Sequence, residues 1–408
     1  MLKAKNLLAV AIISLSLTPV TTALGKDSDS SVSPVRLYQA QAPQNQRAIS
    51  SFEKGKNLYF EGNLTAAEAA FREAIALEPN YAPAYVGLGN VLDDQGKPQE
   101  AIASYQKAIS LNPQDPEAFL NLGLTYVRLD KFPEAINNYQ QAIKLEPKYA
   151  RAYFLLGNVY YYQDKLAEAT RNYEESIRLE PKNPSGYVGL GNVLYEQGKT
   201  EAAIDQYRKA ISISPQSPQA HYFLANALST QNKTSEAIAE YQETIRLEPN
   251  YAPTYFGLAN VFYEIGKAEE AITNYQKAIS LNANYADAYY NLGNVYYDQG
   301  KLAEAVTQYQ TVIKLQPNNS KAYTGLGNAV DDQGKPQEAI ALYKKAISLD
   351  PQYGYAYYNL AITLIKTKQN QEAIRNLNQA KRIFTDEGNQ QMLTKINQIM
   401  QQINRSVN

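Results

Sequence analysis

A proline recurs every 34 residues along most of this 408-residue chain. It stands at eight of nine equally spaced positions, with Ala283 at the ninth: Pro79, Pro113, Pro147, Pro181, Pro215, Pro249, Pro317 and Pro351. A 34-residue period is typical of arrays in which each unit supplies two helices and buries its apolar face only by stacking on its neighbours. The period therefore predicts an all-helical array whose binding surface is a groove rather than an enclosed pocket.

Numbering the proline as position 32 divides the chain into ten units, which begin at 48, 82, 116, 150, 184, 218, 252, 286, 320 and 354. Position 4 is mostly aromatic, position 7 is mostly leucine and position 8 is mostly Gly or Ala. Position 20 is Ala in every unit, and position 24 is aromatic except at Leu377. Positions 4, 7 and 11 lie on one helical stripe, as do positions 20, 24, 27 and 28, so each unit is predicted to contain two amphipathic helices.

Position 15 marks the predicted turn between the two helices of a unit. It is Gly, Asp or Asn in nine units, the residue types that tolerate a left-handed helix end, and only Lys368 departs from this pattern. The proline at position 32 should stop the second helix before the next unit begins. Ala283, which replaces that proline, should therefore permit a slightly longer helix.

The columns resemble the tetratricopeptide repeat family, in which an aromatic, Leu-Gly, a small Ala, a second aromatic and a Pro occupy these places. The resemblance covers residues 48–387 and implies a right-handed superhelical solenoid of about ten helix-turn-helix repeats, with a concave surface lined by the first helices. Residues 388–408 are predicted to form a capping helix and tail, because Met392, Ile396, Ile399 and Ile403 share one helical face.

The remaining composition limits the setting and the partners. Thirty-nine basic and 40 acidic residues offer no field for nucleic acid or anionic lipid. Residues 1–25 have two lysines, an apolar run too short to span a bilayer and then small residues, as in a signal peptide. We expect a chain of bacterial origin that is exported to the periplasm or another extracytoplasmic compartment, with no stable membrane insertion after cleavage. Residues 26–47 are predicted to be a flexible linker.

Position 9 of the first helix is asparagine in seven units and faces away from the apolar stripe, toward the expected concave surface. The amides are candidates for gripping the backbone of an extended peptide: Asn90, Asn158, Asn192, Asn226, Asn260, Asn294 and Asn328. They equally well suit a role in bridging neighbouring helices. The column resembles the asparagine ladder in the superhelical repeats of O-linked N-acetylglucosaminyl transferases.

Aromatic residues at positions 5 and 12 flank this column and are further candidate ligand contacts: Phe154, Tyr161, Tyr195, Tyr222, Phe256, Tyr263, Tyr290, Tyr297 and Tyr358. They suit either apolar peptide side chains or sugar rings, and packing between adjacent first helices is the equal alternative. Position 13 is largely acidic, which favours neutral or basic partners if it lines the groove. Glycines at position 6, such as Gly189 and Gly325, leave room for a ligand backbone or reflect drift after duplication.

Catalysis has little support in the sequence. His221 is the only histidine and occupies a position-4 aromatic slot, where packing is its expected role. No cysteine is present, and no metal-ligand or nucleophile spacing recurs, so we expect no enzyme, cofactor or metal site. The expected function is a scaffold that binds protein or extended peptide and organises an assembly; the alternative is a glycan-binding or polysaccharide-export helper. A chaperone-tail adaptor ranks third, because Arg128, Arg151, Lys321 and Lys366 form no single cationic cluster.

Overall fold

The computed structural model describes residues 45–407, in which 21 helices and no strands form ten helix pairs and a final single helix. The first helices of the pairs are α3 (Gln46–Phe60), α5 (Ala82–Asp94), α7 (Pro116–Arg128), α9 (Ala150–Tyr162), α11 (Pro184–Glu196), α13 (Pro218–Thr230), α15 (Ala252–Glu264), α17 (Ala286–Asp298), α19 (Ser320–Asp332) and α21 (Gly354–Lys366). The second helices are α4 (Leu64–Leu77), α6 (Pro98–Leu111), α8 (Phe132–Leu145), α10 (Leu166–Leu179), α12 (Thr200–Ile213), α14 (Thr234–Leu247), α16 (Ala268–Leu281), α18 (Leu302–Leu315), α20 (Pro336–Leu349) and α22 (Asn370–Asp386). The all-helical repeat architecture predicted from the sequence is confirmed.

The predicted signal peptide and most of the predicted linker, residues 1–44, lie outside the described residues. The first described helix begins at Gln46, two residues before the predicted start of the first unit, and the Asn45 side chain accepts a hydrogen bond from the Arg47 N–H at its N-terminus. Within residues 45–407, no helix combines the length and the apolar character needed to cross a lipid bilayer.

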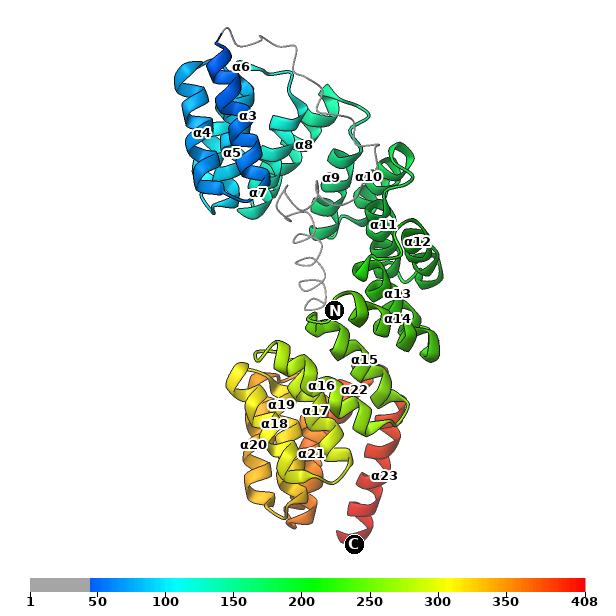
Figure 1. Ribbon diagram of the computed structural model, residues 1–408. Helices are drawn as coiled ribbons and strands as arrows, with labels where there is room; N and C mark the ends of the chain where they lie inside the picture. Colours follow the sequence, from blue (N-terminus) through cyan, green and yellow to red (C-terminus); the bar gives the residue numbers. More distant parts are fainter. Residues whose placement is uncertain (1–44, 408) are drawn as a thin grey trace. The chain divides into compact units, whose positions relative to one another are not determined.

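The chain divides into two compact units, residues 45–223 and 224–407, with the division inside α13. In each unit the first helix of a repeat packs most extensively against the second helix of the same repeat, and that second helix packs against the first helix of the next repeat (Figure 1). First helices of consecutive repeats also touch, as α5 and α7 do in one unit and α17 and α19 do in the other. The first helices thus form a continuous face within each unit, which we call the first-helix face.

The turn at position 15 has the left-handed backbone that the sequence predicts. All six glycines at this position have φ between +71° and +78°, and Asp130, Asp164 and Asn232 have φ of 56°, 62° and 57°. Lys368 adopts the same conformation with φ of 64°, although its residue type does not favour it. The geometry of the helix pair therefore dictates this backbone, whichever residue occupies the position.

The prediction of a longer helix at Ala283 is wrong. Helix α16 ends at Leu281 and has 14 residues, the same length as α6 and α20, whose units carry the proline. Its C-cap Asn282 is already extended, with φ of −140° and ψ of 94°, as the corresponding Asn112 is in α6. The helix therefore ends before the proline position, where the chain must turn into the next repeat. Only α22, which no further repeat follows, runs on to 17 residues.

A column of buried aromatic rings at position 24 forms the centre of the core in both units. Nine of these rings are at most 2% exposed: Phe71, Tyr105, Tyr139, Tyr173, Tyr207, Tyr241, Tyr275, Tyr309 and Tyr343. A Cβ added at Gly157, in the same repeat as Tyr173, would lie 2.9 Å from that ring, and one added at Gly189 in the next repeat would lie 2.5 Å from it. The position-6 glycines therefore leave room for the ring of the preceding repeat. The expectation that they leave room for a ligand backbone is wrong.

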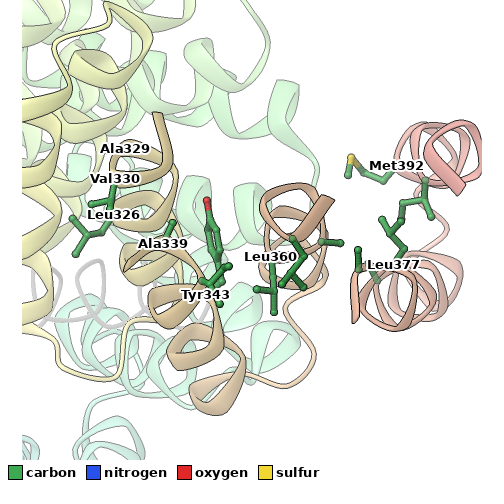
Figure 2. Packing of buried hydrophobic residues seen from close by; sticks show 14 of the residues in the cluster. Leu326, Ala329, Val330, Ala339, Tyr343, Leu360, Leu377 and Met392 are labelled. Atoms are coloured by element: carbon green, nitrogen blue, oxygen red, sulfur yellow. The ribbon is translucent and has the colours of Figure 1, made fainter. Parts of the chain in front are cut away.

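Helix α23 (Gln390–Val407) covers the end of the second unit. Met392, Ile396 and Ile403 are buried on one side of it and belong to the same apolar cluster as Leu377 of α22 (Figure 2). The 3.6-residue spacing of these side chains gives the helix a single apolar stripe, so its outer side remains polar. The predicted capping helix is confirmed.

Candidate functional site

The asparagine column joins the two helices of each repeat. In all seven repeats the position-24 tyrosine hydroxyl donates a hydrogen bond of 2.6–2.9 Å to Oδ1 of the position-9 asparagine. The pairs are Asn90–Tyr105, Asn158–Tyr173, Asn192–Tyr207, Asn226–Tyr241, Asn260–Tyr275, Asn294–Tyr309 and Asn328–Tyr343. A buried hydroxyl needs such a partner, because leaving it unpaired costs about 1–3 kcal/mol. Bridging within the array is therefore one role of the column.

Three of these asparagines also connect neighbouring repeats. The position-6 asparagine of the following repeat donates from Nδ2 to the same Oδ1 atom: Asn121 to Asn90 at 3.1 Å, Asn291 to Asn260 at 2.9 Å and Asn359 to Asn328 at 2.9 Å. Asn158 and Asn192 have no such neighbour: their side chains are 4% and 1% exposed, and their Nδ2 atoms have no partner. These two amides are inaccessible, whereas the other five are half-buried.

The aromatic rows are less accessible than a free contact surface would be. Tyr161 is buried at 7% exposure, which removes it from the surface, and the other eight candidate rings are half-buried. Position-5 rings pack on the position-24 tyrosine of their own repeat, with centroids 5.8–5.9 Å apart in the pairs Phe154–Tyr173, Phe256–Tyr275 and Tyr290–Tyr309. Each ring thus stabilises the helix pair with one surface and leaves part of its area on the first-helix face.

Three position-12 tyrosines donate a hydrogen bond to the position-13 acid of the next repeat. Tyr59 donates to Asp94 at 2.6 Å and Tyr297 donates to Asp332 at 2.6 Å, and Tyr263 donates to Asp298 in the same way. Partial burial and the hydrogen bond to the carboxylate raise the pKa of Tyr297 well above its ordinary value. These hydroxyls therefore remain protonated donors at neutral pH, and the acidic row is part of the structure between repeats.

Ion pairs extend this pattern between the second and third repeats and between the ninth and tenth repeats. Arg128 lies 3.4 Å from Asp93 Oδ2 and 3.6 Å from Asp94 Oδ1, and its Nη1 donates to the Asp93 carbonyl at 3.0 Å. Burial raises the pKa of Asp93, and the Arg128 charge opposes that shift. Lys366 pairs with Asp331 of the ninth repeat at 2.7 Å. Arg128 and Lys366, two of the cations that form no single cluster in the sequence, therefore join neighbouring repeats.

His221 packs as the sequence predicts. Its ring is 7% exposed and Nε2 lies 3.1 Å from the carbonyl oxygen of Pro215. Because a carbonyl only accepts, Nε2 carries the hydrogen in this contact. Tyr85, Tyr153, Tyr187 and Tyr255 donate to the equivalent proline carbonyls of the preceding repeats. The histidine therefore substitutes for a tyrosine in a structural hydrogen bond.

A cavity of about 210 Å³ opens on the first-helix face of the second unit. Five of the predicted site residues line it together: Tyr263, Tyr290, Asn294, Tyr297 and Asn328. They come from α15, α17 and α19, so a ligand in the cavity would touch several repeats at once. Of the candidate site residues, this cavity collects only those near the C-terminal end of the array.

The cavity also has lining residues that were not among the candidate site residues. Asp298, Lys321, Tyr353, Tyr355 and Asn359 complete its walls. Tyr355 is 42% exposed and is one of four large hydrophobic side chains that are exposed among the residues whose burial is described. Position 2, held by Lys321 and Tyr355, varies between repeats, and Tyr353 precedes its helix. The binding residues were predicted from residue types that recur at one position of the repeat. These positions vary from repeat to repeat, so the sequence pattern did not indicate a binding role for them.

Comparison with known proteins agrees with this fold. The family model described as the cilia and flagella-associated protein 70 C-terminal domain, a tetratricopeptide repeat model by its name, matches residues 17–253, more than half of the chain. Models described as TPR repeat match residues 259–300 and 293–334, and one described as tetratricopeptide repeat matches residues 332–396. No curated protein matches the chain significantly.

Among solved structures, a tetratricopeptide repeat protein from Parabacteroides merdae ATCC 43184 is 20% identical, with a TM-score of 0.50 over 62% of this chain and 99% of that one. MamA is 29% identical with a TM-score of 0.38, over 40% of this chain and 95% of that one. YrrB, described as a TPR protein with an unusual peptide-binding site, is 22% identical with a TM-score of 0.40, over 46% and 97%. With helix pairs of 34-residue period and family models that together match residues 17–253 and 259–396, the chain belongs to the tetratricopeptide repeat family.

Proposed function

We propose that the chain is a non-catalytic scaffold that binds an extended segment of a partner protein along the first-helix face of residues 224–407. The observation that carries this proposal is the cavity of about 210 Å³, which is lined by tyrosines and asparagine amides from four consecutive repeats. Tyrosine supplies a large contact area with little rotamer entropy to lose, and amides supply donors and acceptors for a peptide backbone. An open groove of this kind suits a chain rather than a small enclosed substrate.

The polar groups in this cavity do not form a reactive constellation. The Tyr263 and Tyr297 hydroxyls donate to carboxylates, and their pKa values are raised by burial first and by those hydrogen bonds next. Neither tyrosine is therefore poised to act as a base near neutral pH. Among residues 45–407, no group of three or more His, Asp or Glu side chains is placed to hold a metal ion. Recognition is the activity that this geometry supports.

Site-specific photocrosslinking tests the proposal. A photoreactive phenylalanine analogue at Tyr355, in the cavity and 42% exposed, should crosslink to polypeptide from the native envelope. The same analogue at Gln310, an exposed residue on the second helix α18, is the matched control and should give no adduct. Protease treatment of the extract beforehand should abolish the Tyr355 adduct. Equal adducts from both positions would contradict the proposal.

Glycan binding is the second candidate, favoured by the clustering of tyrosine and asparagine side chains in one open cavity. Aromatic rings stack on sugar rings, and amides bind their hydroxyls. In the crosslinking experiment this candidate predicts an adduct at Tyr355 that survives protease and disappears after glycosidase treatment. That result would replace the protein partner with a polysaccharide.

We also propose that the scaffold works outside the cytoplasm and organises a multi-protein assembly there. Support comes from the charge and apolar pattern of residues 1–25, which precede the described residues. Mass spectrometry of the chain purified from its native source should find a mature N-terminus near residue 26. A chain that retains residues 1–25 and fractionates with cytoplasmic markers would refute this setting.

A further inference from the structure

The cavity on the second unit has opposite charges at its two ends. Asp298 is the last residue of α17, and Lys321 is the second residue of α19. The two helices touch and are equivalent in consecutive repeats, so they run in the same direction. Position 13 and position 2 are eleven residues apart in the repeat, which corresponds to about 16 Å along the helix direction at 1.5 Å per residue. The cavity therefore has an acidic end and a basic end.

Neither charge is neutralised within the described part of the chain. Both side chains are exposed, and neither forms an ion pair with any residue in 45–407. Asp298 accepts the Tyr263 hydroxyl on Oδ2, a neutral donor that leaves the negative charge in place. In the next repeat, by contrast, the neighbouring position-12 acid Asp331 is paired with Lys366 at 2.7 Å. Asp298 and Lys321 are thus the free charges of this cavity.

Helix dipoles reinforce the polarity instead of opposing it. A carboxylate at a helix C-terminus and an ammonium at a helix N-terminus each meet the like partial charge of the helix end, which costs about 0.3–1 kcal/mol per residue. Asp298 and Lys321 both have this unfavourable placement. Each end of the cavity therefore combines a side-chain charge with a helix-end charge of the same sign, which strengthens its attraction for an opposite charge on a ligand.

Between the two ends lies a pair of amides that offers a free NH2 group and a free carbonyl oxygen. Asn359 donates to Oδ1 of Asn328, and Tyr343 donates to the same oxygen. These bonds occupy Oδ1 of Asn328 and Nδ2 of Asn359, so the Nδ2 group of Asn328 and the Oδ1 atom of Asn359 make no hydrogen bond within residues 45–407, and both residues line the cavity. One N–H donor beside one carbonyl acceptor complements the backbone of an extended peptide.

We propose, building on the peptide-binding function above, that this cavity selects an extended peptide segment with a cationic side chain near Asp298 and an anionic side chain near Lys321, while Asn328 and Asn359 pair with its backbone. An extended chain rises about 3.3 Å per residue, so the two charged residues of the ligand lie about five positions apart. Tyr290 and Tyr297 supply the walls between them. The charges fix the position of the segment, and the amides accept any sequence in between.

Selection from a displayed library of random dodecapeptides tests this inference with the full chain. Wild-type protein should enrich peptides that carry a Lys or Arg and an Asp or Glu four to six residues apart. Synthetic copies of the enriched peptides are then the probes for affinity measurements. Asp298→Asn should weaken the affinity for these peptides about fivefold, which corresponds to the energy of an exposed ion pair. The same substitution should not change the affinity for peptide copies in which the basic residue is replaced by Gln. Lys321→Gln should show the same dependence on the acidic residue.

Glu304→Gln and Lys345→Gln are the matched controls, because these exposed charges lie on the second helices α18 and α20, outside the cavity. They should leave the affinities unchanged. Asp298→Lys, which makes both ends of the cavity positive, should enrich peptides with two acidic residues in a fresh selection. Circular dichroism confirms that each variant keeps its helices.

Each outcome decides between the two proposals. Enriched peptides without the charge pair, or with affinities that do not respond to Asp298→Asn and Lys321→Gln, overturn the charge selection and leave the peptide-binding function in place. Failure of the wild-type chain to enrich any peptide overturns both proposals. If the wild-type chain then binds immobilised neutral glycans, that result would support glycan binding as the function of the cavity.

Discussion

The Tyr207 hydroxyl donates a hydrogen bond of 2.7 Å to Oδ1 of Asn192, and both side chains are at most 1% exposed. The tyrosine belongs to the second helix of its repeat and the asparagine to the first, 15 residues earlier. The bond therefore fixes the pairing of the two helices inside a dry core. The same pair occurs in seven repeats, which makes it the most regular polar contact of the array.

Removing this hydroxyl should destabilise the chain. Tyr207→Phe keeps the ring but leaves the Asn192 oxygen buried without its donor, and we expect a loss of about 1–3 kcal/mol in the free energy of unfolding. The third repeat provides the control, because Leu124 holds the asparagine position there and Tyr139 has no amide partner at that place. Urea denaturation should show a smaller loss for Tyr139→Phe. Equal losses would mean that the hydrogen bond contributes nothing beyond ring packing.

Alkaline pH should unfold the protein steeply. Burial raises the pKa of seven position-24 tyrosines: Tyr105, Tyr139, Tyr173, Tyr207, Tyr275, Tyr309 and Tyr343. Above pH of about 10 the unfolded chain loses these protons while the folded chain retains them, so stability falls by about 1.4 kcal/mol per pH unit for each such tyrosine. The contribution is fully present below pH 10. Tyrosinate absorbance and helical circular dichroism should therefore change together.

A gradual rise of tyrosinate absorbance at constant helicity would contradict this expectation, because it would mean that the rings ionise in the folded chain.

Breaking the partly buried ion pair between the second and third repeats should create a pH-dependent defect. Arg128→Met leaves Asp93, which is 8% exposed, without its compensating charge, and we expect a loss of about 1–3 kcal/mol at neutral pH. Burial already raises the pKa of Asp93 and Arg128 opposes the shift, so the variant should raise it further. The folded chain then binds the proton more tightly than the unfolded chain, and the loss should shrink as the pH falls toward 4.

Thermal unfolding of Arg128→Met across a pH series measures this effect. Arg72→Met is the control, because Arg72 is 52% exposed in its pair with Glu68 and should change stability by less than about 1 kcal/mol. A defect in Arg128→Met that stays constant with pH would show that lost packing, and not the charge of Asp93, causes it.

Lys368→Gly should stabilise the chain. Lys368 has φ of 64° at the turn of the last repeat, a conformation that costs a residue with a Cβ about 1–2 kcal/mol. The reverse change, Gly300→Ala, meets no atom within 4 Å of the new Cβ, so its expected loss of about 1 kcal/mol is due to the backbone alone. Denaturation midpoints should move in opposite directions for the two variants. A rise for both would show that unfolded-state entropy outweighs the strain of the turn.

The sequence by itself determined the fold class, the repeat boundaries and the helix pairs. A strict 34-residue period with small residues at positions 8 and 20 leaves few ways to bury the apolar stripes other than stacking. It also predicted the left-handed turn and the capping helix, because both depend on local residue types. The error at Ala283 has a local cause too, since the helix ends at Asn282 before the missing proline could act.

Only the tertiary structure decided what the recurrent polar residues do. The column containing Asn192 and Asn328 is uniform in sequence, yet Asn192 is buried and Asn328 lines a cavity. The neighbours differ: position 6 of the next repeat is Phe223 in one case and Asn359 in the other, and Lys321 and Tyr355 line the cavity beside Asn328. Burial and cavity shape depend on contacts between repeats, which a column within one repeat does not encode.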